Sequence, residues 1–137
     1  MKRYTPDEIK EFLIAIDRNL STKAKLVVIG GTAAALGYQF SNATQDIDTA
    51  NSVKDLEAAI KKAKLETGYE IPVGTAGVYD APHDFEDRLL SYEAASFVRL
   101  EVLYPEAIDL ILMKAMRCEE HDLQAIEQIV KSQGVDA

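Results

Sequence analysis

A short apolar run that ends in two glycines is the feature that most restricts how this chain can fold. Residues 25–29 (KLVVI) are mainly apolar and partly β-branched, which is typical of a short buried strand. Gly30-Gly31 follow at once, and residues 32–40 then carry three alanines and a leucine, a composition that predicts a helix packed closely on a sheet. A strand that passes through glycines into a helix favours a fold in which helices cover a sheet.

Helical and strand patterns alternate along the rest of the chain. Thr5-Pro6-Asp7-Glu8 predicts a helix start with a capping box, because Thr5 and Glu8 are three residues apart and Pro6 suits the first helical position. Apolar spacing continues this helix over residues 9–20 and predicts further helices over 53–63 and 105–116 and a last one capped by Asp122, while alternation predicts strands over 46–50 and 97–103. We expect a single domain (1–137) of the α+β (α/β-like) class, with a small mixed β-sheet flanked by helices.

Composition excludes several kinds of site. The chain has one cysteine and two histidines, which argues against a disulfide or a thiolate or histidine zinc site, so any metal would be a hard ion such as Mg²⁺ or Mn²⁺ held by carboxylates. The net charge of −8 argues against sequence-independent binding of nucleic acid. No apolar run approaches the ~20 residues of a membrane span, and the N-terminus lacks the apolar core of a signal peptide, so we expect a cytoplasmic protein without a membrane role.

The glycine turn is a candidate anion site. Gly30 and Gly31 would let backbone N–H groups approach a phosphate, the following helix would add its positive N-terminal end, and Thr32 could donate a hydroxyl hydrogen bond. The turn lacks the spacing of a Walker A loop or a dinucleotide-binding motif. A tight strand-to-helix turn that serves packing alone remains the alternative.

Acidic residues supply the second candidate feature. In a strand Asp46 and Asp48 would point to the same face with Ile47 turned into the core, and two adjacent carboxylates favour a bound cation. Alternation over residues 97–103 puts Glu101 on one face with Arg99, so Glu101 is a candidate third carboxylate if this strand neighbours the aspartates. The alternatives are a solvated edge strand for the aspartates and an Arg99–Glu101 surface pair.

Taken together, the glycine turn, the helix and Thr-x-Asp-Ile-Asp resemble the layout of the DNA polymerase β-like nucleotidyltransferase superfamily. The resemblance implies a nucleotidyltransferase fold in which Gly30, Gly31 and Thr32 hold a triphosphate, and a site where Asp46 and Asp48 bind magnesium. In that superfamily a third carboxylate normally activates the attacking hydroxyl, and Glu101 is the candidate for it, a glutamate where the usual residue is aspartate.

The second half resembles small bacterial nucleotidyltransferase-like proteins of unclear activity, the minimal type found in toxin–antitoxin pairs. The segments FEDRLL and FVRLEVLYPEAIDLILMKAMRCEEHDLQAI carry this likeness, with matching positions at Asp109, Lys114, Arg117 and Asp122. It implies that Lys114 and Arg117 meet the triphosphate, although both could instead pair with nearby acids, and Arg88 is open to the same two interpretations. Relatives commonly carry arginine where this chain has Asn42.

Two functions remain in view, besides a generic α/β domain that uses its acidic surface for protein contacts. The first is metal-dependent transfer of a nucleoside monophosphate from a nucleoside triphosphate to an unknown hydroxyl acceptor: a protein, a tRNA end or a small molecule. The alternative is a catalytically inactive nucleotidyltransferase-fold module that binds nucleotide or a protein partner. The small size leaves room for a partner protein or a homodimer to complete either one.

Overall fold

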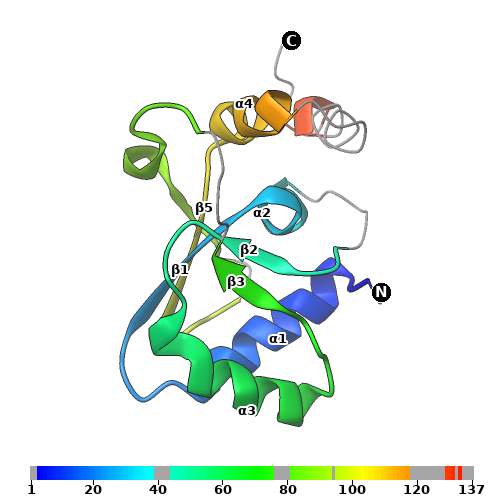
Figure 1. Ribbon diagram of the computed structural model, residues 1–137, viewed down its shortest axis with the longest axis vertical. Helices are drawn as coiled ribbons and strands as arrows, with labels where there is room; N and C mark the ends of the chain where they lie inside the picture. The colour runs from blue at the N-terminus through cyan, green and yellow to red at the C-terminus, as the bar shows by residue number, and fades with distance from the viewer. Residues whose placement is uncertain are drawn as a thin grey trace.

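The computed structural model describes residues 3–38, 44–75, 81–93, 95–117, 129–131 and 133; of residues 114–117 it describes the helical backbone alone. Within this part of the chain, five strands form one mixed sheet in the order β3-β2-β1-β5-β4, and helices pack against it (Figure 1). The predicted α+β class with a small mixed sheet flanked by helices is confirmed. Of the last predicted helix, capped by Asp122, the structure describes residues 129–131 and 133, which are helical; Asp122 itself lies outside the described residues.

Strand β1 lies at the centre of the sheet. It pairs in parallel with β5 on one side and antiparallel with β2 on the other, while β3 runs parallel to β2 and β4 antiparallel to β5. The bounds of the five strands are Ala24–Ile29 (β1), Ile47–Thr49 (β2), Val73–Thr75 (β3), Leu90–Ser91 (β4) and Leu100–Tyr104 (β5). Strand β5 is shorter than the predicted 97–103, because its pairing begins at Leu100.

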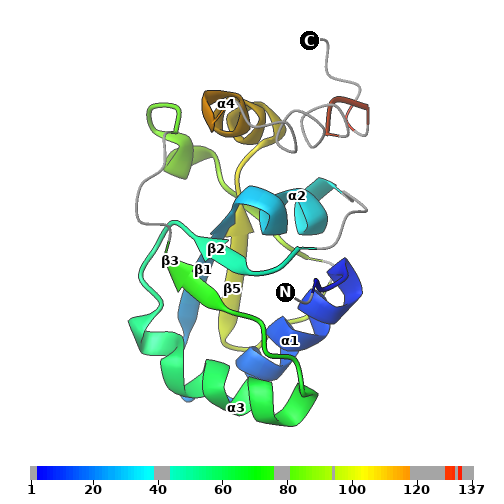
Figure 2. The ribbon, with the colours of Figure 1, turned by 45° about the vertical axis from the view of Figure 1, so that its right-hand side comes forward.

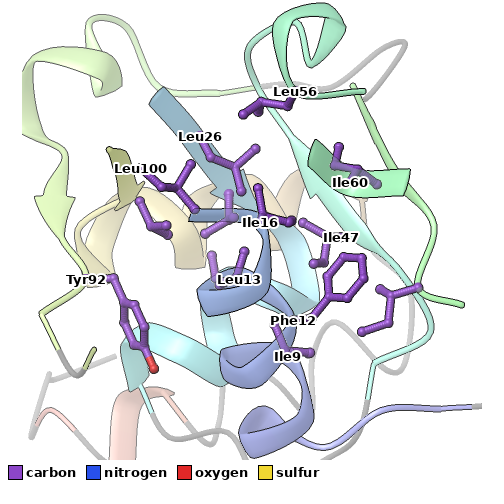
Figure 3. Packing of buried hydrophobic residues seen from close by; sticks show 14 of the residues in the cluster. Ile9, Phe12, Leu13, Ile16, Leu26, Ile47, Leu56, Ile60, Tyr92 and Leu100 are labelled. Atoms are coloured by element: carbon purple, nitrogen blue, oxygen red, sulfur yellow. The ribbon is translucent and has the colours of Figure 1, made fainter. Parts of the chain in front are cut away.

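One face of the sheet packs on helices α1 (Pro6–Arg18) and α3 (Glu57–Thr67), the latter preceded by a short 3₁₀ turn, η1 (Lys54–Leu56). Helix α1 begins with the predicted capping box: the Thr5 hydroxyl accepts a hydrogen bond from the Glu8 N–H, and the Glu8 carboxylate accepts one from the Thr5 N–H. Its apolar side enters the core between the sheet and α3 (Figure 3), through side chains that include Ile9, Phe12, Leu13 and Ile16. The helical spacing read from the sequence therefore marks the buried side correctly.

Helices α2 (Gly30–Tyr38) and α4 (Ala107–Arg117) lie together at the end of the sheet where β1 and β5 finish (Figure 2). The Tyr38 hydroxyl donates a 2.6 Å hydrogen bond to the carbonyl of Pro105, which precedes α4. A second 3₁₀ turn, η2 (Phe85–Arg88), precedes β4. Although α4 is apolar around most of its circumference, Ile108 and Leu112 are 53% and 43% exposed, so one side of it faces solvent among the described residues.

None of the helices in the described ranges is long and apolar enough to cross a membrane.

Candidate functional site

The turn between β1 and α2 requires glycine at its first position. Gly30 has φ of +62°, in the left-handed region that residues with a Cβ rarely adopt, and it directly follows Ile29, the last residue of β1. Helix α2 begins at this glycine and not after Gly31 as the sequence predicted. The partly positive N-terminal end of α2 therefore lies immediately at the edge of the sheet.

The antiparallel pairing of β1 and β2 brings the second aspartate to this turn. Asp48 is the register partner of Ile29, and a Cβ built on Gly30 would lie 3.7 Å from Asp48 Oδ2. Asp46 is exposed, Ile47 is fully buried and Asp48 is partly buried, which matches the predicted alternation. The structure thus brings Gly30 and Asp48 together from positions 18 residues apart in the sequence.

Thr32 has a different contact from the one expected. It is 1% exposed, and its hydroxyl donates a 2.9 Å hydrogen bond to the main-chain carbonyl of Asp46. The Thr44 hydroxyl donates to the same carbonyl at 3.1 Å. In this structure Thr32 thus ties the first turn of α2 to the residue that begins the acidic motif, and a contact of the Thr32 hydroxyl with phosphate stays a prediction.

Glu101 does not join the two aspartates. It pairs with Lys25 across β1 and β5, whereas Asp48 pairs with Ile29, which lies four residues further along β1. Glu101 is therefore offset by about 13 Å along the strands and by two strand spacings, about 10 Å, across them. The predicted carboxylate triad is corrected on this ground, and no group of three metal-binding side chains of His, Cys, Asp or Glu occurs among the described residues.

The register nevertheless keeps Glu101 on the same face of the sheet as Asp48, because residues paired across neighbouring strands point to the same side. Strand β1 lies between the strands that carry them, so they were never direct neighbours. The condition on which the third carboxylate depended, that the strand of Glu101 neighbours the aspartates, is therefore not met.

Helix α4 packs against the end of β1 that leads into the glycine turn. Met113 packs in one apolar cluster with Ile29 and Phe85, so the middle of α4 lies against the residue that precedes Gly30. Lys114 follows Met113, and Arg117 ends the helix. The structure therefore places the backbone of both predicted basic residues on the helix next to the turn, and their contact with a ligand stays a prediction.

An ion pair that the sequence did not reveal anchors η2 to this helix. Arg88 donates from Nε and Nη2 to the two carboxylate oxygens of Asp109 at 2.9 Å, and from Nη2 to the His83 carbonyl at 3.0 Å. Asp109 is 4% exposed, and its hydrogen bonds with Arg88 raise the pKa of the guanidinium. Of the two interpretations of Arg88, the ion pair is observed, but its partner lies 21 residues away and not within the Glu-Asp-Arg segment.

The sequence offered one signal for this pair, an aspartate on an otherwise apolar stretch, since a buried carboxylate needs a partner. The positions of both residues also fall inside the segments that resemble the small nucleotidyltransferase-like proteins. The ion pair therefore joins the two segments in space, through an arginine in the first and an aspartate in the second.

A comparison with protein families agrees with this geometry. The profile of a family described as "nucleotidyltransferase of unknown function" (DUF6036) matches residues 7–136, nearly the whole chain. The chain belongs to this family. Searches with the sequence of the chain found no match among curated proteins and none among solved structures.

The residues that match this nucleotidyltransferase-like family include all parts of the site described above. The match includes the glycine turn, the acidic motif on β2 and helix α4, which the fold brings to one end of the sheet. The same arrangement has the parts that phosphate chemistry uses: a helix start free of side-chain bulk, an adjacent carboxylate and a helix that carries two basic residues.

Proposed function

We propose that this chain is a metal-dependent nucleotidyltransferase, which moves a nucleoside monophosphate from a nucleoside triphosphate to a hydroxyl acceptor. The observation that carries the proposal is the approach of the Asp48 carboxylate to Gly30, where helix α2 begins. A triphosphate held at the start of α2 would there face the carboxylates that bind its counter-ion.

The donor set fits Mg²⁺ or Mn²⁺. Both ions prefer carboxylate oxygens, and Mg²⁺ is commonly held by one or two carboxylates together with substrate phosphates. Asp46 is exposed and directly precedes β2, and Asp48 is partly buried within it, so the two would hold the ion between them and the phosphates. When bound, such an ion neutralises charge on the transferring phosphoryl group.

The chain's own groups would act mainly by positioning and by charge. Gly30 and Gly31 place no side chain of their own at the start of α2, where Asp48 and Thr44 are the nearest groups, and Thr32 fixes the backbone of Asp46. Lys114 and Arg117 would add positive charge toward the triphosphate from α4. Positioning for in-line attack, together with stabilisation of charge by such contacts, supplies most of the rate enhancement in enzymatic phosphoryl transfer.

The acceptor would be a protein, a tRNA end or a small molecule. A partner protein, as in toxin–antitoxin pairs, or a second copy of the chain would supply the surface that holds it.

One observation favours a second candidate, a module that binds nucleotide or a protein without catalysis. Glu101 is offset from Asp48 by four residues of register, so the carboxylate expected to activate the acceptor hydroxyl is not beside the pair. An Asp46/Asp48 pair without a general base would still bind a metal–nucleotide complex.

The experiment is calorimetric titration of ATP, GTP, CTP and UTP with Mg²⁺ and then with EDTA. The wild type is compared with an Asp46→Asn/Asp48→Asn variant, and Asp55→Asn/Glu57→Gln, on the exposed surface of η1 and α3, makes the same change in charge. Binding that needs both the metal and the aspartates, and survives in the control, supports the site.

Absence of metal-dependent binding to any of the four nucleotides would overturn the transferase and the nucleotide-binding form of the second candidate, and would leave the protein-binding form. If binding is found, transfer of a label from the α-phosphate to protein, tRNA or small molecules of a cell extract separates the transferase from the binding module.

A further inference from the structure

A groove lies at the end of the sheet opposite the glycine turn. It has a volume of about 670 Å³ and is lined by residues 23–25, 91–93 and 95–102. Strands β1 and β5 run in parallel, so their first residues share this end (Figure 1). The length of the six-residue strand β1 separates the groove from Gly30 by about 17 Å. The groove is therefore distinct from the candidate site.

Basic side chains are concentrated at this groove. Lys23, Lys25 and Arg99 all line it and are exposed, and in the described part of the chain neither lysine makes an ion pair. Glu93 and Glu101 line it as well, so the groove carries both signs with a small positive excess. The chain as a whole has a net charge of −8, so the sign of the charge at this groove is opposite to the average.

One wall of the groove is held rigidly. The Asp17 carboxylate, at the end of α1 and 6% exposed, accepts hydrogen bonds from the backbone N–H groups of Val98, Arg99 and Leu100 at 2.7–3.1 Å. These bonds fix the backbone of the wall before any ligand arrives, which lowers the entropy lost on binding.

An apolar side chain projects from this fixed wall. Val98 is 77% exposed although its backbone N–H is hydrogen-bonded to Asp17. An exposed aliphatic residue next to Arg99 in a groove that also contains Lys23 and Lys25 suits a ligand that combines negative charge with an apolar group.

The mixed charges decide between ligand classes. The closely spaced phosphates of nucleic acid would meet Glu93 and Glu101 as well as the basic residues. The ring of Tyr92 packs against Phe97 at a centroid distance of 6.3 Å, an arrangement that serves the core more than base stacking. An extended peptide spaces its charges more widely and can place an apolar side chain against Val98. We propose that this groove docks an extended acidic segment of a partner protein; the proposal does not depend on nucleotide transfer at the other end of the sheet.

The test starts with a random linear peptide library displayed on phage, selected on the full chain. We expect the enriched peptides to combine Asp or Glu with one large apolar residue. Fluorescence anisotropy of a labelled enriched peptide then measures affinity for the wild type, for Lys23→Gln/Lys25→Gln and for the control Lys61→Gln/Lys62→Gln, which removes two exposed charges from α3.

Loss of the two groove lysines is expected to weaken binding about tenfold, and more salt to weaken it further, while the α3 control binds as the wild type does. Val98→Ser is expected to weaken binding without changing its salt dependence. Enriched peptides without acidic residues, or equal weakening in the α3 control, would overturn the proposal.

Two other occupants are tested with the same variants. Tight binding of a single-stranded RNA oligomer that disappears in Lys23→Gln/Lys25→Gln, with no acidic peptide enriched, would assign the groove to nucleic acid and overturn the proposal. A dimer in sedimentation velocity that the same substitutions dissociate would assign it to a second copy of the chain, with the same consequence.

Discussion

The Asp48 carboxylate lies beside Gly30, so that a Cβ on this glycine would be 3.7 Å from Asp48 Oδ2. That distance is an ordinary van der Waals contact, and the φ of +62° is therefore the main obstacle to any other residue at position 30. The backbone of this turn, held by its pairing with β2, places the start of α2 against the acidic motif.

Gly30→Ala is predicted to lower the free energy of unfolding by about 1–2 kcal/mol, because alanine is strained in the left-handed region. Urea unfolding of the variant measures this loss. Gly74→Ala is the matched control, since a Cβ there meets nothing within 4 Å, and it is expected to change stability by less than about 0.5 kcal/mol. Equal losses in both variants would show that φ at position 30 is not the cause.

Glu101→Gln is predicted to leave Mg²⁺-dependent nucleotide binding unchanged, whereas Asp48→Asn abolishes the metal-dependent part. The reason is the register: Glu101 lies beside Lys25, four residues along β1 from the partner of Asp48. Calorimetry of the two single variants, with each nucleotide in Mg²⁺ and in EDTA, makes the comparison. A loss in Glu101→Gln as large as that in Asp48→Asn would restore the carboxylate triad that the register argues against.

Local sequence patterns predicted the parts of the fold that depend on neighbours along the chain. The capping box at Thr5 and Glu8, the strand that ends at Ile29 and the alternation around Ile47 all follow from spacing of a few residues, and all are observed. The contact of the glycine turn with the acidic motif was suggested by the family layout and is observed for Gly30 and Asp48.

Strand order and register could not be read from spacing. Alternation placed Glu101 on the correct face, but only the pairing of β1 with β5 shows that Lys25 is its neighbour. The predicted strand was also too long, because Asp17 takes the backbone N–H groups of residues 98–100 from a distance of more than 80 residues in the sequence. The partners of Thr32 and Arg88 were missed for the same reason, since Asp46 and Asp109 are selected by tertiary packing.

Gly37→Ala is predicted to destabilise the protein although alanine favours helices. A Cβ at position 37 of α2 would lie 2.6 Å from Cδ2 and Cε2 of Tyr104, and that ring packs edge-on against Tyr38 at 5.6 Å. Overpacking costs about 1–3 kcal/mol, which outweighs the gain of roughly 1 kcal/mol from helix propensity.

A double-mutant cycle checks the cause of this effect. In a Tyr104→Leu background the clash is relieved, so Gly37→Ala is expected to become neutral or stabilising in urea unfolding. Destabilisation of the same size in both backgrounds would place the cost elsewhere in α2.

Asp17→Asn is predicted to lower the free energy of unfolding by about 2 kcal/mol at neutral pH, because hydrogen bonds to a charged acceptor contribute about 1.5–3 kcal/mol. Burial raises the pKa of Asp17, but the N–H groups of Val98, Arg99 and Leu100 outweigh it and hold the pKa below its ordinary value of 3.8. A lowered pKa in the folded state means that the stabilisation is complete above the unfolded pKa and is lost as the pH falls through the folded one.

The difference between wild type and Asp17→Asn in urea unfolding should therefore be constant near neutral pH and shrink below about pH 4. The exposed Asp55→Asn serves as the control and should show no such difference at neutral pH. Because residues 98–100 form a wall of the groove, Asp17→Asn should also weaken the binding of an acidic peptide that was selected on the wild type. A pH-independent loss of stability would mean that the shape of the side chain, and not its charge, holds this wall.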